Sequence, residues 1–178
     1  PLRPGTELFQ EPYRRISLSL SLKDFVSHST PQFNMVSAEQ MAAVKANIAA
    51  VRGGDVSKTA GDFFIYFFTK FPAHQNRFPA YKGQAIGSLA SVGSWKTHTT
   101  NVVAATLTLV EKAGDAGTLA AAAKQTIADH VSRGGVNAQE YADVLSALVS
   151  FLVESLSVDK AAWEAATGAT AAALKAAF

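Results

Sequence analysis

Apolar residues recur along this chain at the spacing of an α-helix. Met41, Val44, Ile48 and Val51 follow one another at intervals of three and four residues, which places them on one face of a helix. Similar apolar stripes return over most of the chain after residue 36, and Ala and Leu outnumber the β-branched residues. The pattern and the composition together predict an all-α fold.

Capping residues indicate where the helices begin. Ser37 with Gln40, and Asn137 with Glu140, have the form of a capping box, in which two side chains satisfy free backbone N–H groups. Pro72 ends the helix before it, because proline lacks the backbone N–H. We therefore expect long helices to begin near residues 37, 55, 84, 118, 137 and 159, the third running from about 84 to 112.

The second of these helices is unusually rich in phenylalanine. Five phenylalanines in nine residues are more than one narrow apolar stripe requires. Some of them are therefore expected to face a second surface, which is either another helix or a flat apolar ligand. The residues are Phe63, Phe64, Phe67, Phe68 and Phe71.

Residues 1–34 differ from the rest of the chain. They contain four prolines and an alternation of Ser and Leu over residues 17–22, which has the period of a β-strand. No second strand is indicated that could pair with it. We interpret residues 1–34 as an extension of unknown role and residues 35–178 as one domain.

Bulk composition excludes several classes of function. The chain has 178 residues, 48% of them apolar, which is enough for one domain with a sizeable core. Its net charge is +2 and its basic residues do not cluster, so we expect neither nucleic acid nor a membrane surface as a partner. No apolar run approaches the ~20 residues of a membrane-spanning helix. Cysteine is absent, which removes disulfides, thiolate metal sites and cysteine nucleophiles.

The four histidines are the main candidates for chemistry. His28 lies in the extension and His74 in a turn with polar neighbours, so we expect both to be solvated. His98 and His130 lie on separate predicted helices and could face one another across a flat cofactor. No pair of histidines has the one-turn spacing of a zinc site, and no glycine-rich phosphate loop follows a strand.

The order and spacing of several residues resemble the globin family. The segments Trp95-Lys96-Thr97-His98 and Lys160-Ala161-Ala162-Trp163 are similar to those of invertebrate globins, especially the larval haemoglobins of chironomid midges. The resemblance covers about residues 36–178 and implies a globin fold of six to eight helices around a haem b pocket. It also rests on the helix break at Phe71-Pro72, on Phe78, and on the segment from His130 to Val136.

The same resemblance implies the roles of the site residues. His130 is implied to be the proximal ligand of the haem iron, and His98 the distal histidine that stabilises a bound ligand. The second ring nitrogen of a metal-binding histidine needs a hydrogen-bond acceptor, and the backbone carbonyl near Thr126, one turn earlier, is a plausible one.

Five further residues are implied to contact the haem or its ligand. Phe78 corresponds to the phenylalanine stacked on the porphyrin, with Tyr81 close by at the pocket corner. Val102, one turn after His98, and Phe64 are expected to cover the ligand side. Arg133 resembles the basic residue that reaches a haem propionate.

The resemblance implies a protein that binds O2 reversibly, together with CO and NO, for transport or storage, and that is not primarily an enzyme, with a secondary peroxidase-like activity left open. An N–H group of His98 is expected to favour O2 over CO. Three alternatives stay open: a peroxidase or nitric oxide dioxygenase, a sensor in which His98 itself ligates iron, and a helical interaction module without a cofactor. Asp129 adjoins His130, but neighbouring residues of a helix point apart, which argues against a peroxidase-like pair.

The resemblance to chironomid globins implies an extracellular location in haemolymph, while a cytoplasmic location stays open. The extension of residues 1–34 is foreign to the family pattern. Its role stays open between a lid over a surface, a link between subunits of a homo-oligomer, and a cloning remnant.

Overall fold

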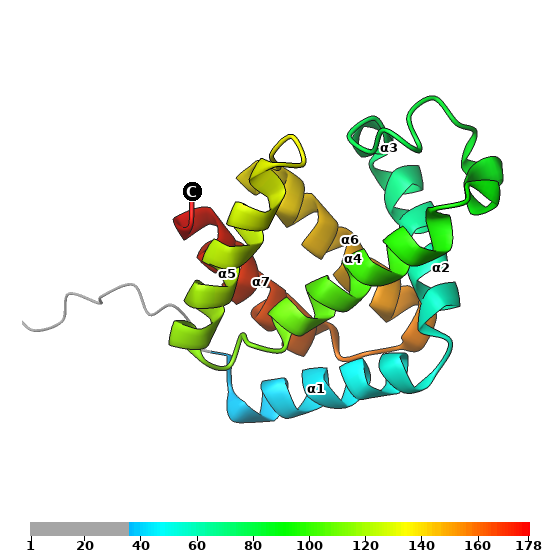
Figure 1. Cartoon of the computed structure of the whole chain (residues 1–178). Helices are drawn as coiled ribbons and strands as arrows, with labels where there is room; N and C mark the ends of the chain where they lie inside the picture. Colours follow the sequence, from blue (N-terminus) through cyan, green and yellow to red (C-terminus); the bar gives the residue numbers. More distant parts are fainter. Residues whose placement is uncertain (1–35) are drawn as a thin grey trace, which may run out of the picture. The chain divides into compact units, whose positions relative to one another are not determined.

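The computed structural model describes residues 36–178, which form seven α-helices and one short 3-10 helix (Figure 1). The extension predicted at residues 1–34 lies outside the described residues, as does His28. The all-α class and the helix number are confirmed for the described part. None of its helices is long and apolar enough to cross a membrane. The elements are α1 (Ala38–Gly53), α2 (Val56–Lys70), α3 (Pro72–Gln75), η1 (Ile86–Ser91), α4 (Trp95–Val110), α5 (Ala116–Val131), α6 (Ala138–Leu156) and α7 (Lys160–Ala176).

The predicted capping boxes are present. At α1 the backbone N–H of Gln40 donates to the Ser37 hydroxyl over 3.1 Å, and the N–H of Ser37 donates to the Gln40 side chain over 2.9 Å. Asn137 and Glu140 make the same reciprocal pair at the start of α6, at 2.9 and 2.8 Å. These bonds satisfy backbone N–H groups that a helix leaves free at its first turn.

The long helix predicted over residues 84–112 is wrong in its first half. Residues 86–91 form the 3-10 helix η1, and Val92 is extended, with ψ of 124°, before α4 begins at Trp95. Gly87 and Gly93 weaken an α-helix here. The bend lets Leu89 and Trp95, which are 0% and 6% exposed, both pack into the core. It also places His98 in the first turn of α4.

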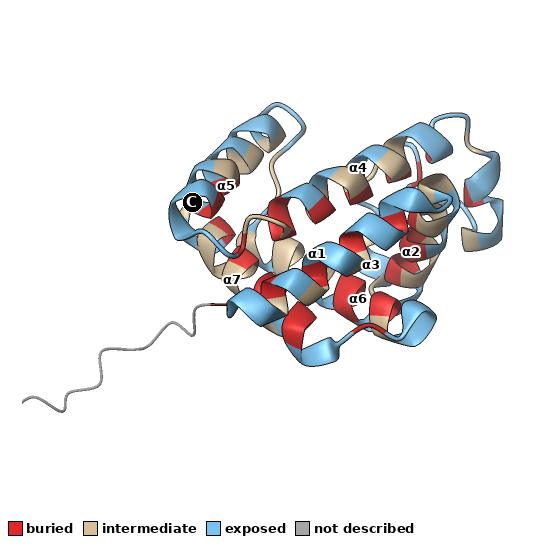
Figure 2. Ribbon diagram, turned by 90° about the horizontal axis from the view of Figure 1, so that it is seen from below, coloured by how far each residue is buried: buried red, intermediate tan, exposed pale blue. Residues whose placement is uncertain are grey.

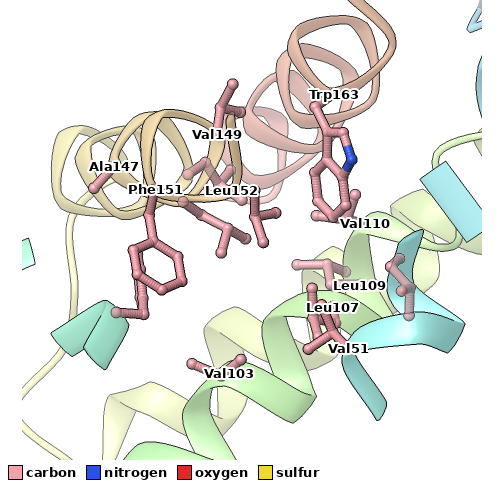
Figure 3. Close-up of a cluster of buried hydrophobic side chains, with 14 of the residues drawn as sticks. Val51, Val103, Leu107, Leu109, Val110, Ala147, Val149, Phe151, Leu152 and Trp163 are labelled. Atoms are coloured by element: carbon pink, nitrogen blue, oxygen red, sulfur yellow. The ribbon is translucent and has the colours of Figure 1, made fainter. Parts of the chain in front are cut away.

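Helices α2 and α7 hold the fold together. Helix α7 contacts α1, α4, α5 and α6, while α2 contacts α1, α3, η1, α4 and α6. Figure 3 shows Trp163 of α7 and Leu152 of α6 near Leu107 and Val110 of α4. Each large side chain buried in this way contributes about 1.5–3 kcal/mol to folding.

The phenylalanines of α2 face two surfaces, as predicted. Phe63 packs edge-on against Phe151 of α6, with ring centroids 5.7 Å apart. Phe64 instead contacts Trp95 of α4 at 6.0 Å and His98 at 5.8 Å. One set of rings therefore builds the core, and the other builds the surroundings of His98. Phe178 lies beyond the end of α7 and is 62% exposed.

Candidate functional site

His130 lies in the last turn of α5 with one ring nitrogen already engaged. Its Nδ1 atom is 2.7 Å from the backbone oxygen of Thr126, one turn earlier. A carbonyl oxygen can only accept, so Nδ1 carries the proton and donates it. The lone pair of the neutral ring then lies on Nε2, the atom that a metal would use. The carbonyl contact expected from the sequence is thus present.

The turn after His130 is held by backbone geometry and by one arginine. Gly134 and Gly135 have φ of 92° and 68°, a left-handed conformation that glycine adopts without strain. The Gly135 N–H donates to the His130 carbonyl over 2.9 Å. Arg77 donates to the Gly135 carbonyl at 2.7 Å and pairs with Glu140 at 2.7 Å. Arg77 therefore ties the segment that carries Phe78 to the turn beside His130, a link that no local sequence signal predicts.

His98 lies in the first turn of α4 among aromatic rings. Its ring is 5.5 Å from that of Phe78 and 5.8 Å from that of Phe64, measured between centroids. Its Nδ1 atom is 2.8 Å from the Tyr81 hydroxyl. Burial lowers the pKa of His98, and the positive charge of Arg133 lowers it further. The ring is therefore neutral at pH 7, and Nε2 has no hydrogen-bond partner among the described residues.

The aromatic residues around His98 contact one another as well. Phe78 lies 5.4 Å from Phe68 and 5.8 Å from Tyr81, and Tyr81 lies 5.1 Å from Trp95. Tyr81 is only 1% exposed, so it is buried beside His98. Val102 lies one turn after His98 on α4 and is half-buried. The structure thus gathers Phe64, Phe78 and Tyr81 around His98, with Val102 one turn further along α4.

The surroundings of His130 are more open than those of His98 and include a buried hydroxyl group without a partner among the described residues. Tyr141 and Val144 of α6 are half-buried rather than buried. The Tyr141 ring lies 5.6 Å from that of His130. The Tyr141 hydroxyl is buried and has no partner among residues 36–178. Burial first, and then the charge of Glu140, raises the pKa of Tyr141 to about 12, although Arg133 opposes the shift.

Arg133 connects the two sides electrostatically. Its side chain is exposed, and its charge helps to lower the pKa of His98 on α4 and opposes the rise in the pKa of Tyr141 on α6. An exposed cation between the two sites is suited to pair with an acidic group at the edge of a ligand.

These residues fit a haem. The donor set offers one imidazole whose lone pair is free, a second imidazole with an unengaged Nε2, half-buried apolar side chains and a cation. The buried, unpartnered hydroxyl of Tyr141 beside His130 indicates that something other than protein completes this environment. Within the described residues, no three His, Asp or Glu side chains gather as a metal site made by protein alone would require.

His74 and Asp129 are two further polar residues for which the sequence analysis led to an expectation. His74, expected to be solvated, is half-buried, and its Nε2 lies 2.8 Å from an Asp143 carboxylate oxygen on α6. The pairing joins residues far apart in the sequence, so the local pattern could not reveal it. Asp129 accepts a hydrogen bond from the Gln125 side chain at 2.7 Å, and its charge contributes to the raised pKa of Tyr141.

Comparisons with known proteins agree with the geometry. The Globin family model matches residues 61–174. Globin CTT-VIIB-4 of Chironomus thummi thummi is 28% identical over 123 residues, which cover 67% of this chain and 76% of the relative. A globin of Aplysia kurodai is 32% identical over 117 residues, 65% of this chain and 79% of the relative. A double mutant of the myoglobin from Aplysia limacina superposes with a TM-score of 0.69 and 25% identity, covering 80% of this chain and 98% of that one. The chain therefore belongs to the globin family.

Proposed function

We propose that this globin binds haem b through His130 and binds O2 reversibly, for transport or storage. The observation that carries the proposal is the bond from His130 Nδ1 to the Thr126 carbonyl, because it leaves Nε2 free for iron. Haem held by His130 would supply an iron centre that can bind O2, CO or NO. The similarity to a ferric Aplysia limacina myoglobin with azide bound supports this reading.

The residues around His98 are the ones that would contact the bound O2. His98 offers a neutral imidazole to a ligand, and its Nε2 is not engaged by protein. Phe64 and Phe78 exclude water from that side, since their rings flank His98 at 5.8 and 5.5 Å. Arg133 is the residue that would pair with a propionate at the haem edge.

A carrier is favoured over a haem enzyme by the partner of His130. A peroxidase-like site needs a carboxylate on the proximal histidine, which increases the basicity of the ring. Here the partner is a neutral backbone carbonyl, and the neighbouring Asp129 is bonded to Gln125. We extend the proposal to an extracellular location in haemolymph, which the likeness to Chironomus globins supports.

Absorption spectra of the ferric, ferrous, ferrous-CO and ferrous-O2 forms test the proposal. A strong Soret band, one broad visible band in the ferrous form and two bands under O2 are expected for a five-coordinate oxygen carrier. Two sharp bands in the ferrous form without added ligand would place His98 on the iron and overturn the carrier function. Absence of a Soret band after haem is added would overturn haem binding itself.

Substitution of the two histidines separates their roles. His130→Ala is expected to lose haem, and free imidazole is expected to restore the Soret band to His130→Gly by replacing the missing ligand. His98→Leu serves as the matched control, which keeps haem but releases O2 faster. A hydrogen bond to a charged group is worth about 1.5–3 kcal/mol, so O2 release should accelerate roughly ten- to hundredfold. Stable haem retention by His130→Ala, measured by transfer to an apoglobin acceptor, would contradict the assignment.

A further inference from the structure

The hydroxyl of Tyr81 and the Nδ1 atom of His98 form a buried contact of 2.8 Å. Tyr81 is 1% exposed and belongs to the segment between α3 and η1. No other hydrogen-bond partner of Nδ1 occurs in the part of the chain that the structure describes. The proton distribution of the His98 ring is therefore set by this one hydroxyl.

The direction of this hydrogen bond follows from the chemistry of the two groups. A neutral imidazole has one N–H and one basic nitrogen, and the partner of either nitrogen decides which one carries the proton. The imidazole nitrogen is a far stronger base than a phenol oxygen, so the O–H donates and Nδ1 accepts. Burial raises the pKa of Tyr81, although a hydrogen bond from Ser94 opposes the shift. The phenol thus keeps its proton at pH 7 and can donate it to Nδ1.

We propose that Tyr81 is a positioning residue that fixes His98 in the tautomer with the proton on Nε2. The inference rests on the proposed function, because this tautomer presents an N–H donor to a ligand and the other tautomer presents a lone pair. A lone pair would repel the negative end of a polar ligand. Tyr81 therefore acts through His98, in addition to the position at the pocket corner that the resemblance implied.

The protein holds Tyr81 in place from several sides. The buried Gln75 side chain donates to the backbone carbonyls of Tyr81 and Gln84, over 2.7 and 2.8 Å. The Tyr81 ring also packs edge-on against Trp95 at 5.1 Å. Because the backbone and the ring are both fixed, the hydroxyl cannot easily turn away from His98.

Tyr81→Phe tests the inference because it removes the hydroxyl and keeps the ring. In the ferrous-CO holoprotein, long-range nitrogen NMR of labelled histidine should show His98 protonated on Nε2 in the unmodified chain and a mixture of tautomers in the variant. The C–O stretching frequency should rise in the variant, since a nearby N–H donor lowers it. O2 release should accelerate about two- to tenfold, as expected for a weakened neutral hydrogen bond. Tyr66→Phe is the matched control, because its hydroxyl bonds Glu154 at 2.7 Å and not His98.

Three outcomes would overturn the inference. The first is a proton on Nδ1 of His98 in the unmodified protein, which needs no variant. The second is a Tyr81→Phe variant whose tautomer, C–O frequency and O2 release all match the unmodified protein. The third is an equal acceleration of O2 release by Tyr81→Phe in a His98→Leu background, which would show that Tyr81 acts by packing alone. A protein without a Soret band would instead defeat the proposed function, and the tautomer of His98 could still be read in the haem-free chain.

Discussion

The ionisation of Tyr141 is a direct measure of how deeply its hydroxyl is buried beside His130. Its hydroxyl is buried without a partner among the described residues, and burial raises its pKa to about 12. The ordinary value is about 10, so the unfolded chain loses this proton first. Protonated Tyr141 therefore makes its full contribution to the free energy of unfolding below pH 10, and this contribution is lost as the pH rises towards 12. An ultraviolet titration of tyrosinate in the haem-free chain should therefore show a phase near pH 12 that Tyr141→Phe removes. Complete ionisation of all tyrosines by pH 11 would contradict this.

At the scale of single residues, the sequence identifies the site histidines better than it identifies the side chains that hydrogen-bond to histidines. His98 and His130 were assigned through the resemblance to globins, and the Thr126 carbonyl followed from helical geometry. The partners of His74 and of Tyr81 lie 69 and 17 residues away in the chain. Such pairs depend on how helices pack, which local periodicity does not encode. The role of Tyr81 therefore emerges only when the side chains are placed.

Helix α5 is the element least secured by the protein itself. It buries only Leu119 and Ala123, whereas α6 buries six residues, and Figure 2 shows α5 mostly in the exposed and intermediate colours. A helix with few buried apolar contacts unfolds locally at a low cost in free energy. In haem-free protein we expect amide hydrogens of α5 to exchange much faster than those of α6, and haem to slow them. Equal protection of α5 and α6 without haem would show that α5 needs no ligand.

The contact between α2 and α4 depends on a glycine. A Cβ atom added at Gly61 would lie 3.2 Å from the indole nitrogen of Trp95, so a larger side chain must displace the ring that packs on Tyr81. Overpacking of this kind costs about 1–3 kcal/mol, and we expect Gly61→Val to lower the free energy of unfolding by that amount. Gly168→Val on α7 is the control, because nothing lies within 4 Å of its added Cβ, and its effect should stay within about 0.5 kcal/mol. Equal losses for both variants in urea denaturation would rule out the packing explanation.

Element boundaries were predictable where they depend on neighbouring residues. The capping boxes at Ser37 and Asn137 act within four residues, and both were correct. The break between η1 and α4 was missed because Leu89 and Trp95 must both reach the core, a requirement of tertiary packing. The glycines at 87 and 93 permit the break, but they do not specify it.

Across the whole molecule, protein packing holds the His98 side of the site more firmly in place than the His130 side. The side of His98 is built from buried rings of α2 and α4 and from the fixed segment around Tyr81. The side of His130 lies on α5, with Tyr141 and Val144 half-buried beside it. Arg77 joins the two sides through the Gly135 carbonyl and Glu140. Ligand binding to the native state alone adds stability by mass action, and its effect should be greatest on the side of His130.

Acid should destabilise the whole molecule through His98. Burial and the Arg133 charge lower its pKa in the folded chain, while the unfolded chain keeps the ordinary value of about 6.5. As the pH falls through 6.5, the unfolded chain binds a proton that the folded chain does not, so the free energy of unfolding decreases until the folded pKa is passed. The Asp115 carboxylate, whose pKa is lowered by the backbone N–H of Thr118, acts in a separate window below about pH 4. Urea denaturation of haem-free protein between pH 7.5 and 5 should therefore show a decline that is shallower in His98→Leu, and an identical slope in both proteins would exclude His98 as its source.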